Sequence, residues 1–141
     1  MGISYQPLPV LSMKTELDWL LNRYPNEKRT RHGWLFYQDV NVSLSKIPLS
    51  VKCRLAFFDT SSYDERLYAY ESDVLYAFTV SSYYGRGCRA VLVLKYRWRF
   101  LDVWVRLAQS YYFYSDKVGS GLTQINGHHK TELRMQCCFR L

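Results

Sequence analysis

Few residues in this sequence have the types and spacing that catalysis, metal binding or phosphate binding requires. His128 and His129 are adjacent in a glycine-bearing segment, but a metal site needs further Asp, Glu or Cys ligands nearby. The segment Gly119-Ser-Gly121 lacks the helix and the Lys-Ser/Thr pair that mark a phosphate-binding loop. We therefore expect exposed loop residues here, with no catalytic group, no metal ligand and no cofactor site.

Two pairs of carboxylates are the remaining candidates for chemistry. Asp64 and Glu65 lie in a polar stretch, and Glu71 and Asp73 lie near a strand end. General acid–base catalysis needs groups held in a fixed geometry, and nothing in the local pattern holds these. We expect all four side chains to be solvated loop charges and the protein not to be an enzyme.

The cysteines offer no framework for a disulfide or a zinc site. The chain has four, Cys53, Cys88, Cys137 and Cys138, without CxxC or Cys/His spacing. Adjacent residues project to opposite faces of a strand, so Cys137 and Cys138 point apart. We expect the cysteines to act as small apolar residues.

The net charge and the aromatic content favour a membrane surface or a polyanion such as nucleic acid as the binding partner. The chain carries 19 Lys and Arg against 12 Asp and Glu, a net charge of +7, and 17% of its residues are aromatic. Lys95-Tyr-Arg-Trp-Arg-Phe100 interleaves cations with rings, which suits stacked bases and phosphates. The rim of a membrane barrel needs the same composition, with Trp98 and Phe100 in the interface and arginines at the headgroups. A solvated basic face is the third interpretation.

The elements that must position these residues are β-strands, because hydrophobic residues recur at every second position. The candidate strands cover Leu11–Trp19, Trp34–Val42, Leu49–Phe57, Val74–Val80, Cys88–Trp98, Val103–Phe113 and Glu132–Leu141, and Leu67–Tyr70 is either the start of the fourth or a short eighth. We expect a single all-β domain over residues 1–141. Its predicted architecture is an antiparallel up-and-down meander of 7–8 long strands, a partial or minimal β-barrel.

The alternation gives each strand an apolar and a polar face. The apolar faces carry no charge and the opposite faces carry Arg and Lys, which fits a barrel with lipid outside and water inside. The residues expected to face lipid are Leu92, Leu94, Val103, Val105, Leu107, Leu133, Met135, Phe139 and Leu141. The basic residues expected to face the lumen are Lys52, Arg54, Arg89, Lys95, Arg97, Arg106, Arg134 and Arg140.

Short and long connections alternate along the chain, as they do at the two rims of a barrel. Residues 45–48 and 97–101 are short enough for hairpins, and Tyr84-Gly-Arg-Gly87 supplies glycines for a turn. Longer polar stretches cover residues 22–32, 59–66 and 115–130. The last two are candidate recognition loops, because long loops of such barrels face outward.

Neither a signal peptide nor a transmembrane helix is recognisable in this sequence. No run of 18 or more apolar residues predicts a transmembrane helix. The first ten residues lack the basic and apolar regions of a signal peptide. If the protein is exported, we expect this chain to be the C-terminal part of a longer product.

From Gly33 onward the sequence resembles the final segment of a Bacteroidetes-type outer-membrane β-barrel of the helix-hairpin-helix domain-containing family. The resemblance covers about three quarters of the chain and rests on Gly33-Trp-Leu-Phe-Tyr-Gln-Asp39, the stretch from Phe58 to Phe78, Tyr84-Gly-Arg-Gly87, the stretch from Gly119 to Gly127, and Lys130-Thr-Glu-Leu-Arg-Met-Gln136. It implies an outer-membrane location, with lipid, the barrel-insertion machinery and upstream strands of a longer protein as partners.

The same resemblance implies a full-length form with a signal peptide and an N-terminal helix-hairpin-helix module, and neither is recognisable in this sequence. DNA is therefore expected as a partner only where that module is restored. Family barrels tend to end on an aromatic residue, whereas this chain ends Phe139-Arg-Leu141, with the aromatic two positions earlier. That departure weakens the expected signal for insertion.

Two other classes of function fit the same pattern. A soluble β-barrel would turn the apolar faces inward and bind a small apolar ligand. A basic sheet that binds nucleic acid would show steep salt dependence. We rank both below a structural or transport-related outer-membrane barrel.

Overall fold

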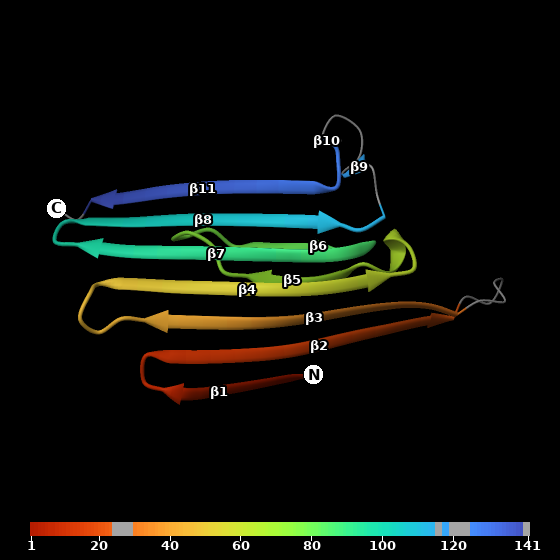
Figure 1. Cartoon of the computed structure of the whole chain (residues 1–141), viewed down its shortest axis with the longest axis horizontal. Helices are drawn as coiled ribbons and strands as arrows, with labels where there is room; N and C mark the ends of the chain where they lie inside the picture. The colour runs from red at the N-terminus through yellow and green to blue at the C-terminus, as the bar shows by residue number, and fades with distance from the viewer. Residues whose placement is uncertain (24–29, 115–116, 119–124, 140–141) are drawn as a thin grey trace.

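One long antiparallel sheet dominates the computed structural model, which describes residues 1–23, 30–114, 117–118 and 125–139 (Figure 1). Its strands are β1 (Gly2–Leu8), β2 (Leu11–Arg23), β3 (Thr30–Ser43), β4 (Leu49–Thr60), β7 (Arg86–Trp98), β8 (Leu101–Tyr112) and β11 (His129–Phe139). They lie in the order β1-β2-β3-β4-β7-β8-β11, so that the chain meanders across the sheet. The predicted all-β antiparallel meander is confirmed, and the sheet is open, as in a partial barrel.

The strands are long. From β2 onward, the strands of this sheet have 11 to 14 residues, whereas strands of globular proteins usually have about five or six. Fourteen residues of extended chain span about 45 Å at roughly 3.3 Å per residue. Within the described residues, no helix has the length and apolarity needed to cross a membrane.

Two strands differ from the sequence-based prediction. Residues 2–8 pair with β2 although no strand was expected there, and the pairing shifts register between Tyr5 and Leu8. The predicted strand Val74–Val80 is wrong, because residues 74–78 instead form the end of a short hairpin. Alternation cannot separate a sheet strand from a short hairpin in so brief an apolar run.

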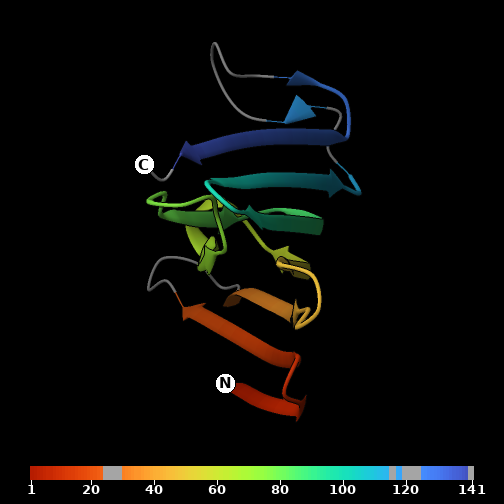
Figure 2. The ribbon, with the colours of Figure 1, turned by 90° about the vertical axis from the view of Figure 1, so that its left-hand side faces the viewer.

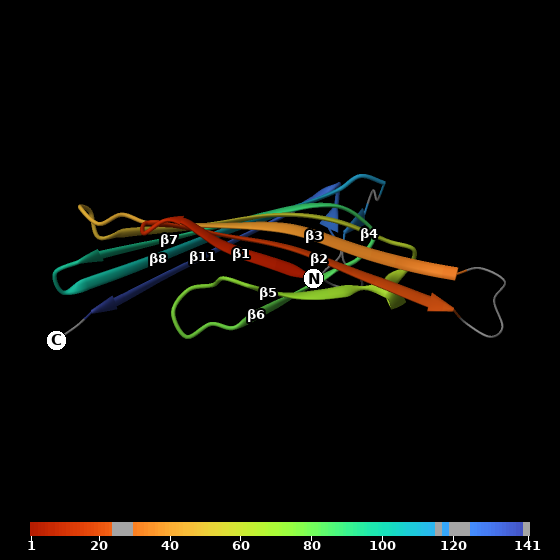
Figure 3. The ribbon, with the colours of Figure 1, turned by 90° about the horizontal axis from the view of Figure 1, so that it is seen from below.

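That hairpin consists of β5 (Leu67–Glu71) and β6 (Thr79–Tyr83), and it follows the one-turn 3-10 helix η1 (Tyr63–Glu65). It belongs to the connection between β4 and β7 and does not join the main sheet. Figure 3 shows it folded back beneath the middle strands, and Figure 2 shows the same arrangement along the strands. We call the sheet face that carries this hairpin the inner face and the opposite face the outer face.

Short and long connections lie at opposite ends of the sheet (Figure 1). Two residues join β1 to β2 and β7 to β8, and five join β3 to β4, which confirms the two predicted hairpins. The longer connections leave from the other end. One of them includes the predicted turn at residues 84–87, where Gly85 has a φ of 75°. The two-residue strands β9 (Lys117–Val118) and β10 (Ile125–Asn126) lie in another.

The packed core lies between the hairpin and the inner face. Leu35, Tyr37, Ala56 and Phe58 of the sheet form one buried cluster with Ala69 and Tyr83 of the hairpin. The rings of Phe58 and Tyr83 meet edge to face at 5.4 Å between centroids. The hairpin therefore supplies the second layer that the inner face needs for burial.

Candidate functional site: an acidic hairpin on an arginine row

Four arginines project from four neighbouring strands of the inner face. They are Arg54 on β4, Arg89 on β7, Arg106 on β8 and Arg134 on β11, and we call them the arginine row. Arg106 and Arg134 stand directly opposite each other in the β8–β11 register. Like charges at this spacing destabilise a sheet, and buried charges need partners. The row must therefore be neutralised by carboxylates.

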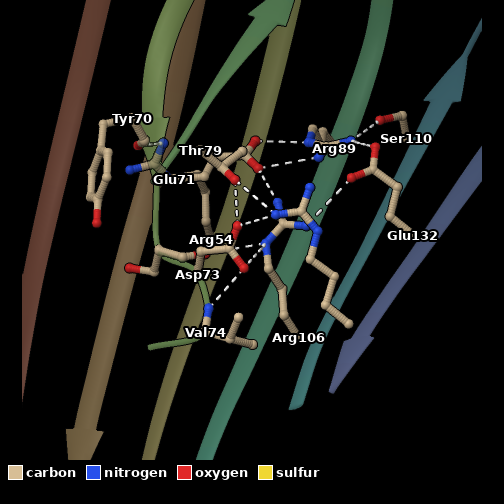
Figure 4. Close-up of polar contacts among 12 residues, drawn as sticks. Arg54, Tyr70, Glu71, Asp73, Val74, Thr79, Arg89, Arg106, Ser110 and Glu132 are labelled. Carbon is tan, nitrogen blue, oxygen red and sulfur yellow. Dashed lines mark hydrogen bonds and ion pairs between the residues drawn. The ribbon is translucent and has the colours of Figure 1, made fainter. Parts of the chain in front are cut away.

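Glu71, the last residue of β5, binds two members of the row (Figure 4). Arg89 donates from Nε to Oε1 at 2.7 Å and from Nη2 to Oε2 at 3.1 Å. Arg106 donates from Nη2 to Oε2 at 2.6 Å. The Tyr83 hydroxyl donates to Oε1 at 2.6 Å. Glu71 and Arg106 are both completely buried, so this carboxylate clamps the hairpin to β7 and β8.

Asp73 extends the clamp to β11. Its Oδ2 accepts from Arg134 Nη1 and from the Thr79 hydroxyl, and its Oδ1 accepts from the Val74 backbone N–H at 2.7 Å. Arg106 Nε lies 3.7 Å from the same Oδ1. The contacts across the end of the hairpin preorganise Asp73 for the two arginines, since its side chain is held on both oxygens.

Arg54 is held by Asp39 of the neighbouring strand β3, on the same face of the sheet, and by the hairpin backbone. Its Nε and Nη2 donate to the two carboxylate oxygens of Asp39 at 2.6 and 2.7 Å, the bidentate geometry that arginine favours. Its Nη1 donates to the Tyr70 backbone oxygen at 2.6 Å. The guanidinium also stacks over the Tyr37 ring at 3.9 Å.

Glu132 on β11 completes the neutralisation. Its Oε2 lies 3.4 Å from Arg106 Nη1, and its Oε1 lies 3.5 Å from Arg89 Nη1. The Ser110 hydroxyl oxygen also accepts a hydrogen bond from Arg89 Nη1, at 2.6 Å. The four arginines of the row thus face four carboxylates, those of Asp39, Glu71, Asp73 and Glu132.

The surroundings of Glu71 and Tyr83 shift the pKa values of both side chains. Burial alone would raise the pKa of Glu71, but hydrogen bonds and charge from Arg89 outweigh it and hold this pKa below its ordinary value of 4.5. Burial, and then the charge of Glu71, raise the pKa of Tyr83. Glu71 is therefore an ionised acceptor at neutral pH, and Tyr83 is a neutral donor to it.

The structure places the predicted apolar and basic residues on opposite faces of the sheet. The register puts Leu92, Leu107 and Leu133 in one row across β7, β8 and β11. The other described members of the set expected to face lipid lie on the same outer face: Leu94, Val103, Val105, Met135 and Phe139. Leu141 and Arg140 lie outside the described residues.

The basic set lies on the inner face but divides into two groups. Arg54, Arg89, Arg106 and Arg134 form the neutralised row. Lys52, Lys95 and Arg97 lie on the same face nearer the short turns: Lys52 pairs with Val93, and Lys95 with Trp104. They line the same cavity. Sequence alternation predicted that these residues share one face of the sheet, but it did not predict which of them are paired with carboxylates.

The interpretation of the carboxylates as solvated loop charges is wrong for three of the four. Glu65 and Glu71 are completely buried, and the side chain of Asp73 is buried as well, whereas Asp64 is exposed. A signal for this was present, because arginines recur on the polar faces of β4, β7 and β8 without enough acidic residues on the strands to pair with them. Buried arginines without local partners require carboxylates from elsewhere.

The expectations for the other groups are unchanged. The His128 ring lies beside Tyr111 at 6.2 Å between centroids. Within the described residues, no three His, Cys, Asp or Glu side chains gather as metal ligands. The absence of metal and cofactor sites stays a prediction, as does the role of residues 59–66 and 115–130. No family model, curated protein or solved structure matches this chain.

Proposed function

We propose that this chain is part of a bacterial outer-membrane β-barrel, non-catalytic and structural or transport-related. In this proposal the outer face meets lipid, the inner face lines the lumen, and the β5–β6 hairpin fills part of that lumen. The resemblance to the Bacteroidetes helix-hairpin-helix domain-containing family supports the same assignment, since its motifs run through β3, the hairpin and β11.

The observation that carries the proposal is the inverted distribution of polarity over the two faces. On the outer face Leu133, Met135 and Phe139 are 63–66% exposed, and nothing in the described part of the chain covers them. On the covered inner face Arg106 and Glu71 are completely buried. A soluble protein rarely bares a large apolar sheet face to water, because such a patch aggregates or binds a partner. In a membrane barrel, lipid covers that face.

Strand length and the placement of the connections support the same function. Strands of 11 to 14 residues are long enough to cross the hydrocarbon core when tilted. Short turns at one end and long connections at the other match the periplasmic and extracellular rims of such barrels. The hairpin enters from the end with the long connections, which is the end that carries the functional loops in these proteins.

The open sheet edges define the partners that the proposal requires. Among the described strands, none lies beside the outer edge of β1 or of β11, and unpaired edges invite pairing. We propose that further strands of a longer protein close the barrel here, and that the barrel-insertion machinery delivers it to the outer membrane. DNA becomes a partner only where a helix-hairpin-helix module is attached.

The two alternatives are less well supported. In a soluble barrel with an apolar interior the hairpin would lie outside, yet it packs against the face that holds the buried charges. In a nucleic-acid-binding sheet the arginines would be free for phosphates, yet those of the row are engaged by carboxylates.

Refolding of the purified chain tests the proposal. The chain is folded with and without neutral detergent micelles, and far-UV circular dichroism is compared with heat-modifiable migration on a gel. We expect a β-spectrum and a heat-sensitive compact band only when micelles are present. A monodisperse β-rich species in plain buffer would overturn the proposal in favour of the soluble barrel.

A further inference from the structure

A cavity of about 640 Å³ lies between the end of the hairpin and the inner face, toward the short turns. Residues 74–77 of the hairpin form one wall, and Lys52, Lys95, Arg97 and Trp104 of the sheet form the other. The volume falls in the range of small-molecule sites, about 300 to 1,000 Å³. The cavity therefore has the size of a ligand site, separate from the arginine row.

The lining of this cavity has an excess of positive charge. Lys52, Lys95 and Arg97 contribute three cations, and Asp73 is the one carboxylate among the described lining residues. That carboxylate is already engaged by Arg134 and the Thr79 hydroxyl. The carboxylates of the row balance its arginines, whereas Lys52 and Lys95 have no free carboxylate beside them among the described lining residues.

The three cations differ in how firmly they are held. Lys95 lies over the Trp104 ring, with Nζ 5.1 Å from the ring centroid, and Arg97 Nε lies 3.9 Å from Asp102. Both are therefore positioned by the sheet. Within the described part of the chain Lys52 makes no ion pair or hydrogen bond, and it is exposed, so its ammonium is available to a ligand.

Most of the remaining lining is apolar or aromatic, and Ser43 and Ser50 add two hydroxyl groups. Trp104 is buried at 5% exposure and lies beside Val93 on the sheet, while Leu75 and Leu44 line the sides. Rings and aliphatic side chains bind a flat apolar group, and converging ammonium groups bind an anionic one. The cavity combines the two requirements.

We infer that this cavity binds a small organic anion, with a carboxylate or phosphate held by Lys52 and Lys95 and a ring held against Trp104. The inference rests on the inner face alone. It holds whether the outer face is covered by lipid or by something else, so it goes beyond the proposed function and can fail separately from it.

Calorimetric titration with phenyl phosphate tests the inference on the full chain, in whichever medium gives a β-spectrum. We expect binding by the unmodified chain and a loss of at least about tenfold in affinity in the double variant Lys52→Gln/Lys95→Gln, since charge-assisted bonds to the anion are removed. Lys46→Gln, an exposed change in the β3–β4 turn with the same loss of charge, is the matched control and should change affinity less than twofold.

Two further probes identify which part of the ligand matters. Benzyl alcohol, which has the ring without the charge, should bind at least about tenfold more weakly, and so should inorganic phosphate, which has the charge without the ring. Absence of phenyl phosphate binding, equal binding by the double variant, or equal binding of benzyl alcohol would overturn the inference. A retained β-spectrum in the double variant shows that a loss of binding is not a loss of fold.

Discussion

Burial and charge act in opposite directions on Glu71. The side chain is completely buried, and an unpaired carboxylate there would be neutral or would unfold the hairpin. Two arginines and the Tyr83 hydroxyl reverse the balance, so that the ionised form is the stable one. Such a carboxylate makes the docking of the hairpin dependent on pH.

The sign of that dependence follows from the lowered pKa of Glu71. The folded-state pKa lies below the ordinary 4.5, so the ionised carboxylate stabilises the docked hairpin above that pH. The contribution decreases as the pH falls through the folded-state pKa. We measure the urea midpoint of unfolding by circular dichroism as a function of pH. We expect no contribution of Glu71 to its pH dependence between pH 7 and pH 5, and we expect the midpoint to fall below pH 4.5.

The variant Glu71→Gln is the control for this residue. At pH 7 it should lower the free energy of unfolding by about 3 kcal/mol, because it leaves buried guanidiniums short of a partner. It should also lose less stability than the wild type between pH 5 and pH 3. An equal loss in both proteins would assign the acid sensitivity to other carboxylates.

At the scale of elements, the hairpin depends on a close approach between η1 and β3. A Cβ at Gly33 would lie 2.7 Å from the Glu65 backbone oxygen and 3.3 Å from Thr60 Cγ2. Gly33→Ala should therefore lift η1 from the sheet and lower the free energy of unfolding by about 1–3 kcal/mol, the usual cost of overpacking. Urea denaturation measures it.

The same substitution at Gly2 is the matched control. The atoms nearest to a Cβ there belong to the Glu16 side chain, at 3.4 Å, an ordinary contact distance. Gly2→Ala should change stability by less than about 0.5 kcal/mol. If both variants lost the same stability, the close contact of η1 with Gly33 would not be what positions the hairpin.

At the scale of the whole molecule, the question is what covers the outer face. Leu107 lies in the middle of β8 on that face, and Tyr111 lies near its end, with 42% and 46% exposure. In water an arginine at either position would be tolerated equally. In lipid an arginine costs about 2–4 kcal/mol at the midplane and about 0–1 kcal/mol near the interface.

We therefore expect Leu107→Arg to lower the free energy of unfolding in micelles or bilayers by about 2–4 kcal/mol, and Tyr111→Arg by less than about 1 kcal/mol. Reversible urea unfolding of the bilayer-inserted chain measures both. Equal, small effects at the two positions would contradict lipid contact at the outer face.

The sequence alone determined the fold class and the two faces of the sheet, because alternation is a local property of each strand. Within one strand, Leu92 and Leu94 had to point to the face opposite that of Arg89 and Lys95, whatever the neighbouring strands were. The turns at 45–48 and 97–101 were predictable for the same reason, since their signals lie within a few residues.

Only the tertiary structure decided which strands belong to the sheet and which charges are paired. Residues 2–8 show no clear alternation, yet β2 provides a partner for them. Glu71 meets Arg106 from 35 positions away, a contact that no local pattern encodes. The hairpin docks on the inner face because charges buried there need carboxylates, and that requirement exists only once the strands have assembled.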